Sequence, residues 1–222
     1  MFETLQEANS FFCRDLLSQG VNSWNQWRIE HPFSAVNLTN ICLQGVDLSG
    51  ANFTNVSFAG ADLRGANLEE VNFVRANLSQ ANLNQAICRS ANFSLSNLYR
   101  ANLSESNLIE ANLDQAMLYE ANLNRADLTH ASLCSAILSC ANLHQANLFK
   151  ANLSQADCHS TVLSHTNLDS ANLLGTSLLG ANLNNACLRE AKLGLRNLIK
   201  LGFIRLKPQL DPVARSGRQW NC

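Results

Sequence analysis

The residues that could perform chemistry are few, and their spacing does not assemble a catalytic site. Glu69 and Glu70 are adjacent, so they cannot form a facing pair of carboxylates. His144 and His165 are 21 residues apart and could lie close together, but two histidines without a third ligand make a poor zinc site. Glycine-rich phosphate-binding loops are absent. The sequence therefore predicts a protein that is not an enzyme and that holds no cofactor or metal.

The element that must position any functional site is a five-residue repeat from Val36 to Leu195. It comprises 32 consecutive units without an insertion. The third residue of each unit, here called the centre, is Leu in 26 units, Phe in four and Cys in two. The residue two before the centre is Ala in 22 units, and the residue just before it is Asn or Asp in 22. In an extended backbone, residues two apart point the same way, so we predict Ala and the centre inside and Asn outside.

A unit this small cannot bury its apolar pair alone, which predicts a solenoid of stacked units. Similar residues recur every 20 positions, which indicates four pentapeptides in each coil and about eight coils with a square cross-section. At about 4.8 Å between strands, the stack is roughly 40 Å long. The recurring residues include the predicted core stack Phe53, Phe73 and Phe93, the pair Tyr99 and Tyr119, and the opposite charges Arg100/Glu120 and Glu105/Arg125.

With these features the chain resembles the pentapeptide repeat family, whose motif is written A(D/N)LXX. The resemblance covers about 160 of 222 residues. It implies an all-β solenoid, a right-handed quadrilateral β-helix with a packed interior, and a scaffold or interaction protein without catalysis. The departures are mild: the position two before the centre is bulky in early coils, as at Val46, and polar at a few later positions, as at Ser96.

The ends of the chain are predicted to cap the solenoid. Residues 1–35 are expected to form an N-terminal helical cap with helices over 3–19 and from Ser23 to Ile29, in which Trp24 and Trp27 share one face. The segment LLSQGVNSWNQWRIEHP resembles the start of many cyanobacterial pentapeptide repeat proteins. Residues 36–195 form the β-helix, and residues 196–222 form a C-terminal cap with a basic tail of net charge +5.

The spacing of the cysteines and the hydropathy of the chain predict the cellular compartment of the protein. The eight cysteines are not spaced like a disulfide set, and Cys88 and Cys158 occupy centres as small buried hydrophobic residues. The first residues lack the basic and long apolar regions of a signal peptide, and no apolar run could span a membrane. We therefore expect a cytoplasmic protein with reduced thiols.

The sides of the solenoid differ in the residues they expose. One side should carry a ladder of Asn82, Asn102, Asn122 and Asn142. The preceding side exposes Tyr99, Met117, Tyr119 and Ile137, which we predict as an interaction patch for an unidentified protein partner. The alternative is that these stacked side chains only support neighbouring coils.

Two further functions remain open, and the sequence leaves the oligomeric state undecided. A nucleic-acid mimic that binds a type II topoisomerase needs a strongly acidic surface. The repeats carry a net charge of only −4, and acids such as Glu105 are expected to pair with bases such as Arg125, so this function is disfavoured. The basic tail could instead dock to a membrane surface or to nucleic acid, since both are anionic.

Overall fold

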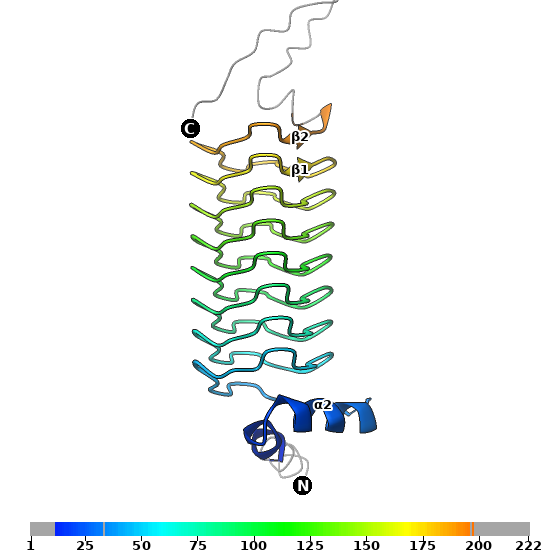
Figure 1. Cartoon of the computed structure of the whole chain (residues 1–222). Coiled ribbons are helices and arrows are strands. Elements are labelled where there is room, and N and C mark those ends of the chain that lie inside the picture. Colours follow the sequence, from blue (N-terminus) through cyan, green and yellow to red (C-terminus); the bar gives the residue numbers. More distant parts are fainter. Residues whose placement is uncertain (1–11, 33, 196, 198–222) are drawn as a thin grey trace, which may run out of the picture.

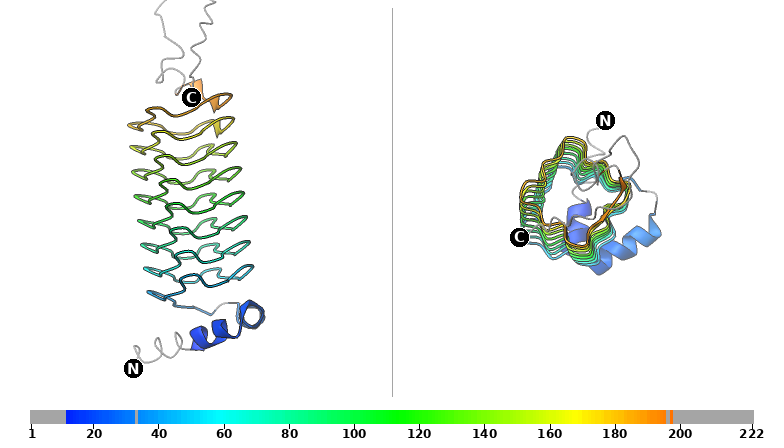
Figure 2. Two further views of the ribbon diagram at one scale, coloured as in Figure 1. Left: turned by 60° about the vertical axis from the view of Figure 1, so that its left-hand side comes forward. Right: turned by 90° about the horizontal axis from the view of Figure 1, so that it is seen from above.

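The protein is a stack of coils with helices at its N-terminal end (Figure 1). The computed structural model describes residues 12–32, 34–195 and 197. Parallel bridges join residues that are 20 apart on all four sides, as from Asn37 to Ser57 and from Asn82 to Asn102. Strand β1 (Asn172–Leu173) pairs in parallel with β2 (Lys192–Leu193) at the C-terminal end of the stack. Seen along its axis the stack is a four-sided tube, as the 20-residue spacing predicts (Figure 2).

The unit around Leu98 shows why five residues suffice. Leu98 N donates to Met117 O of the next coil at 2.8 Å, and Ala101 N donates back to Leu98 O at 3.0 Å, which closes a β-turn. The third residue of that turn, Arg100, has a φ of 54°, in the left-handed region that such turns require. Asn97 Oδ1 accepts from Tyr99 N at 3.0 Å. Asparagine before the centre is thus explained by a local bond from its side chain to the turn.

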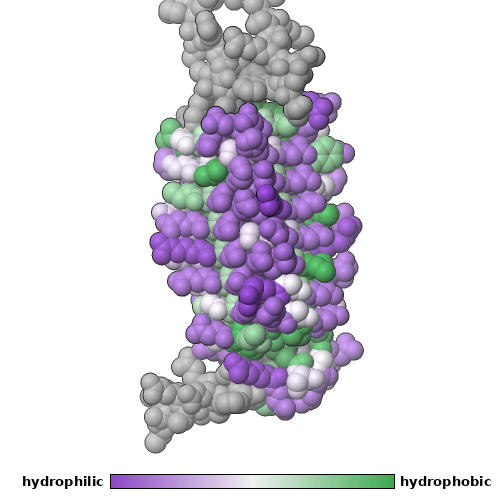
Figure 3. Space-filling model, turned by 90° about the vertical axis from the view of Figure 1, so that its left-hand side faces the viewer, coloured by the Kyte–Doolittle hydropathy of each residue, from purple (hydrophilic) through white to green (hydrophobic). Residues whose placement is uncertain are grey.

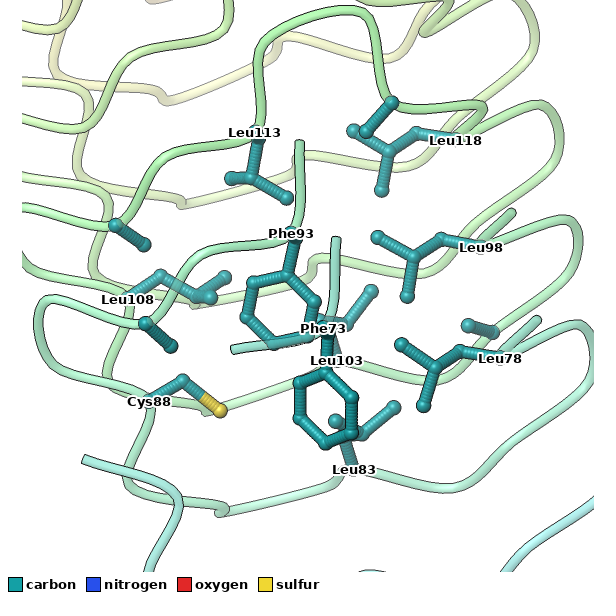
Figure 4. Close-up of a cluster of buried hydrophobic side chains, with 14 of the residues drawn as sticks. Phe73, Leu78, Leu83, Cys88, Phe93, Leu98, Leu103, Leu108, Leu113 and Leu118 are labelled. Carbon is teal, nitrogen blue, oxygen red and sulfur yellow. The ribbon is translucent and has the colours of Figure 1, made fainter. Parts of the chain in front are cut away.

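The interior is filled by the residues predicted to point inward. Phe53, Phe73 and Phe93 form a column in which successive ring centroids lie 5.5 and 5.2 Å apart with nearly parallel planes. Leucines of successive coils stack in the same way beside them, and Cys88 lies fully buried among them (Figure 4). Each added coil therefore buries the apolar surface of the coil before it.

The N-terminal segment is helical in its described part. Residues 12–18 form a helix within the predicted span 3–19, of which residues 1–11 lie outside the described residues. Helix α2 (Val21–Glu30) begins two residues earlier and ends one residue later than expected, and Pro32 follows it. Trp24 is fully buried, with its ring centroid 5.2 Å from that of Phe53, so it continues the phenylalanine column.

Helix α2 also bonds to the backbone of the first coil. Trp24 Nε1 donates to Asn52 O at 2.8 Å, and Asn25 Oδ1 accepts from Asn52 N at 2.8 Å. Arg28 Nη2 donates to Thr54 O at 2.8 Å. In the second coil, the corresponding backbone atoms bond to the first coil. Side chains of α2 thus take the place of a preceding coil.

One inward position of the first coil is less covered than the repeat alone predicts, whereas the others are buried. Val46 occupies an inward position but is 38% exposed. A cavity of about 400 Å³ lies beside it, between the helix at 12–18 and the first coil, with Arg14 and Leu17 on one wall and Ile41 and Leu43 on the other. A first coil has no coil beneath it, so burial there depends on how far the helices reach.

Candidate interaction surface

The four predicted patch residues lie on one side of the stack. We name this side, with the outward residues around Leu98, Leu118 and Leu138, the tyrosine face. Tyr99 and Tyr119 are stacked, with ring centroids 6.0 Å apart and planes 11° apart. Met117 and Ile137 are directly paired across adjacent coils. Tyr119, Met117 and Ile137 are 39%, 46% and 41% exposed, and Tyr99 is half-buried, so all four reach the same surface.

Charged neighbours hold the tyrosines in place. Arg100 Nε lies 2.5 Å from Glu120 Oε2, as the 20-residue charge pattern predicted, and the guanidinium carbon lies 5.0 Å from the Tyr99 ring centroid. The pKa of Glu120 is lowered, chiefly by its hydrogen bond from Arg100. The pKa of Tyr119 is raised, chiefly by its hydrogen bond to Glu120. These contacts close a chain of four side chains over two coils and orient both rings.

Met117 and Ile137 occupy positions at which most units use asparagine. Where asparagine is present its Oδ1 accepts from the backbone N–H two residues on, as at Asn97 and Asn77. A methionine or isoleucine side chain cannot accept that bond with comparable strength, so each forgoes a local stabilising interaction. The apolar side chains on the tyrosine face are therefore not explained by the stability of the repeat.

The next side carries the predicted asparagine ladder, and we name it the asparagine face. Nδ2 of Asn102 donates to Asn82 Oδ1 at 3.1 Å, and Nδ2 of Asn122 donates to Asn102 Oδ1 at 3.0 Å. Asn142 continues the ladder with a longer bond of 3.5 Å to Asn122. Figure 3 shows one side of the stack, on which hydrophilic side chains predominate and a few apolar side chains are scattered among them.

One predicted ion pair is wrong. Glu105 and Arg125 were expected to pair, but Glu105 accepts from Gln85 Nε2 at 2.9 Å and Arg125 Nε donates to Gln145 Oε1 at 2.8 Å. Glu105 bonds to the glutamine of the preceding coil, and Arg125 bonds to the glutamine of the following coil. Since all these partners are 20 residues apart, the spacing cannot distinguish these bonds from a Glu105–Arg125 ion pair. The two charges thus do not neutralise one another through direct contact.

Charge is concentrated on the side that follows the asparagine face, here called the charged face. Ten of the 20 charged residues of the repeats project from it, and only Arg100, Glu120 and Asp157 project from the tyrosine face. On the charged face Arg89 lies between Glu69 and Glu110, at 4.0 and 3.5 Å. The tyrosine face thus carries far fewer charged residues than the charged face.

The two histidines are close, as the sequence allowed. The ring centroids of His144 and His165 are 5.4 Å apart, on adjacent coils. His144 Nδ1 lies 2.8 Å from Ser164 Oγ, and His165 Nε2 lies 3.2 Å from Asn185 Nδ2. Within the described ranges, no group of three or more His, Cys, Asp or Glu residues could hold a metal ion. The rings are satisfied by polar neighbours on the stack.

The cysteines correct one expectation. Cys88 and Cys158 are fully buried at centres, and burial raises the pKa of the Cys158 thiol to about 12. Cys42, Cys134 and Cys140 are free as well. Cys187, however, is disulfide-bonded. The spacing of the cysteines along the sequence does not indicate this bond.

Two residues of helix α2 that contact the first coil, Asn25 and Arg28, were not predicted from the sequence. Arg28 is only 5% exposed, and its pKa is lowered chiefly by desolvation, with Cys13 raising it. Asn25 bonds to the backbone of the first coil at Gly50 and Asn52. The sequence signal for these contacts is the spacing of Trp24, Asn25 and Arg28, which places the three side chains near one another along one side of the helix. Trp27 packs beside Trp24 at 5.8 Å. The predicted basic tail lies outside the described residues apart from the buried Asn197.

The fold and its surface define a class: a four-sided solenoid of stacked pentapeptides with rigid, chemically distinct sides. The family described as "Pentapeptide repeats" matches in eight copies, over residues 33–70, 72–100, 96–133, 126–157 and 156–194. The chain therefore belongs to the pentapeptide repeat family, as its motif indicated. Comparison with curated proteins gives no match.

Solved structures of the same family are similar to the chain. HetL from the cyanobacterium Nostoc sp. strain PCC 7120, described as involved in heterocyst differentiation regulation, is 32% identical over 72% of this chain and 86% of its own, with a TM-score of 0.37. QnrB1, a plasmid-mediated fluoroquinolone resistance protein, is 17% identical over 78% of this chain and 100% of its own, with a TM-score of 0.47. No helix of the described residues is long and apolar enough to cross a membrane.

Proposed function

We propose that this protein is a non-catalytic interaction module whose tyrosine face binds another protein. The observation that carries the proposal is the convergence of Tyr99, Met117, Tyr119 and Ile137 on one exposed surface. Tyrosine and methionine are enriched at protein interfaces, whereas charged residues are depleted at interface cores. The stacked rings are held by Arg100 and Glu120, so little side-chain entropy is lost on binding.

A second candidate, mimicry of nucleic acid toward a type II topoisomerase, is less well supported. QnrB1 is similar in sequence at only 17% identity, which bears on the fold alone. The acids of the charged face are interleaved with bases such as Arg89 and Lys150 rather than forming an acidic surface. A supercoiling assay with purified gyrase tests this function directly, and we expect no inhibition at micromolar protein.

The test of the interaction surface is the double change Tyr119→Ser with Ile137→Asn. Both substitutions introduce residues that the repeat already uses, so the melting temperature should stay within a few degrees of wild type or rise. Recovery of a specific protein from native extract should fall at least tenfold. The control is Ile87→Asn, which removes an equally exposed isoleucine, 44% exposed, from the charged face. Equal recovery by all three proteins, with intact folds, would refute the surface.

We also propose that α2 caps the N-terminal end of the stack. Trp24, Asn25 and Arg28 bond to backbone groups that a preceding coil would otherwise satisfy, and an open end would invite edge-to-edge association. Arg28→Ala should therefore lower stability by about 2–4 kcal/mol and increase aggregation, since two backbone carbonyls lose their donor. Thermal unfolding with light scattering measures both effects; an unchanged melt would show the cap to be unnecessary.

A further inference from the structure

Val46 is an inward-pointing residue that the N-terminal helices leave partly uncovered. It is 38% exposed, whereas Val36 and Ile41, which hold equivalent positions in the first coil, are 3% and 2% exposed. Beside Val46 lies the cavity of about 400 Å³, whose walls include Leu17, Ile41 and Leu43. Sites for small molecules usually have mostly apolar walls and volumes of roughly 300–1,000 Å³. The cavity therefore has the size and the walls of a small-molecule site.

The N-terminal helices close one side of the first coil and leave the opposite side open. Helix α2 bonds to the backbone at Asn52 and Thr54. In the view along the axis, α2 lies at one edge of the tube (Figure 2). The cavity lies two pentapeptides earlier, around Leu43, and hence on the opposite side of the four-sided coil. Its walls lack the packing contacts that an apolar group of fitting size would restore.

A single positive charge lies in the wall of this apolar cavity. Arg14 is the one charged residue among the described residues that line it, and Ser18 and Asn40 add polar side chains. Arg14 is exposed, so its charge lies where the cavity meets solvent. No described residue forms an ion pair with it, since the adjacent carboxylate of Asp15 accepts from Gln19 Nε2 at 3.3 Å. A guanidinium in this position is suited to bind a carboxylate with two parallel hydrogen bonds.

The acids of the stack near the cavity are bonded to other groups. Asp47, which follows Val46, accepts from Asn67 Nδ2 at 3.0 Å. Asp62 of the second coil is paired with Arg64 at 2.7 Å. The cavity thus combines aliphatic walls with one cation that has no counter-ion among the described residues, and charge complementarity favours an anionic ligand.

We propose that this cavity binds a small organic carboxylate with an aliphatic body. The aliphatic body lies against Leu17, Leu43 and Val46, and the carboxylate bonds to Arg14. The site is separate from the tyrosine face, so this binding activity is additional to the interaction function. Because the ligand contacts both the helix at residues 12–18 and the first coil, it stabilises the attachment of the N-terminal helices to the stack.

Octanoate and two analogues of the same chain length test the ligand class. Isothermal titration calorimetry should show saturable binding of octanoate to the full-length protein, and saturating octanoate should raise the melting temperature by a few degrees. Octan-1-ol, which lacks the charge, should bind at least tenfold more weakly. Octylamine, which carries the opposite charge, should not bind. Equal binding of the three compounds, or no binding of octanoate, would overturn the proposal.

The thiol of Cys42 reports whether the ligand lies in this cavity. Cys42 is exposed and belongs to the lining. Octanoate should slow its alkylation by iodoacetamide at least fivefold, as measured by mass spectrometry. Cys140, which is also exposed but lies at a corner of a later coil, is the internal control and should react at an unchanged rate. Equal protection of both thiols, or of neither, would overturn the location of the site.

Two variants separate the contributions of charge and volume. Arg14→Gln should weaken octanoate binding at least tenfold and leave octan-1-ol binding unchanged. Val46→Phe fills part of the cavity and should weaken both ligands at least tenfold, with an unchanged or higher melting temperature. The matched control is Arg75→Gln, which removes an exposed arginine at a distant corner and should bind octanoate like wild type. Undiminished octanoate binding by Arg14→Gln and Val46→Phe would overturn the site.

A carboxylate with an aliphatic chain must also be distinguished from a membrane lipid. Sedimentation with phosphatidylglycerol vesicles makes this distinction, and we expect the wild-type protein to stay in the supernatant. Co-sedimentation that octanoate competes away and that Arg14→Gln abolishes would assign the cavity to a lipid, and would overturn the free carboxylate as its ligand.

Discussion

The tyrosine face and the asparagine face are built on the same backbone but use it differently. On the asparagine face, Asn102 and Asn122 bond both to their own turns and to each other along the stack. On the tyrosine face, Met117 and Ile137 hold equivalent positions and forgo those bonds. The comparison distinguishes residues whose hydrogen bonds stabilise the solenoid from residues that give up those bonds. A surface that carries residues of the second kind is a candidate for function.

The largest expected effect comes from breaking the register on which both faces depend. Inserting one residue after Gln115 should abolish cooperative unfolding in the later coils, since it moves every later side chain off its inward position. Deleting Ala101 to Glu120 removes one complete coil and should leave a soluble, shorter stack. Circular dichroism and thermal melts distinguish the two variants. Equal damage in both would mean that the coil is not the unit of stability.

A buried charge should be the next most damaging change. Leu123 is fully buried behind the asparagine face, and Leu123→Arg should cost about 4 kcal/mol or more, because the core offers the charge no partner. Asn124→Arg places the same charge in solvent, with a loss of about 1 kcal/mol from its bond to His144 O. Urea unfolding measures the difference. Similar midpoints would contradict the assignment of inward and outward positions.

Exchanging one residue between the two faces tests the comparison directly. Asn122→Ile should destabilise by about 1–2 kcal/mol, because it removes the acceptor for Asn124 N and two bonds along the ladder. Ile137→Asn should stabilise by about 0.5–1 kcal/mol, because asparagine can accept from the turn. Denaturant melts of the two single variants suffice. Changes of the same sign in the free energy of unfolding would show that the two faces do not differ in how their outward residues affect stability.

The ion pair behind the tyrosines should contribute a small, pH-dependent stability. Since the pKa of Glu120 is lowered in the folded protein, its contribution is present above the ordinary carboxyl value of 4.5 and is lost as pH falls through the lowered pKa. Glu120→Gln should therefore melt slightly below wild type at pH 7, and the difference should shrink as pH falls below 4.5 and disappear below the lowered pKa. Arg100→Gln should behave alike, and a difference that does not shrink as pH falls below 4.5 would exclude the ion pair as the cause.

The smallest expected effect lies beneath the tyrosine face. Ser96 is fully buried and its Oγ has no hydrogen-bond partner, whereas Ser106 Oγ donates to Leu103 O at 2.7 Å. Ser96→Ala should stabilise by up to about 1 kcal/mol, because it removes an unsatisfied hydroxyl at a position that usually holds alanine. Ser106→Ala should be neutral or destabilising. A loss of stability in Ser96→Ala would mean that its hydroxyl is satisfied.

The sequence by itself determined the coil. The period of five residues and the recurrence at 20 identified which side chains point inward, which stack, and that Tyr99, Met117, Tyr119 and Ile137 share a side. This was possible because every contact within the stack repeats at a constant offset, so local pattern and tertiary structure coincide. The family followed from the same pattern.

Only the tertiary structure decided the contacts that the constant offset of 20 residues does not specify. The choice between Glu105–Arg125 and their glutamine neighbours depends on side-chain rotamers, which a period cannot specify. The bonds of Trp24, Asn25 and Arg28 to the first coil depend on how a helix docks against it. Repetition makes the interior predictable, while its ends and surface depend on contacts that occur once.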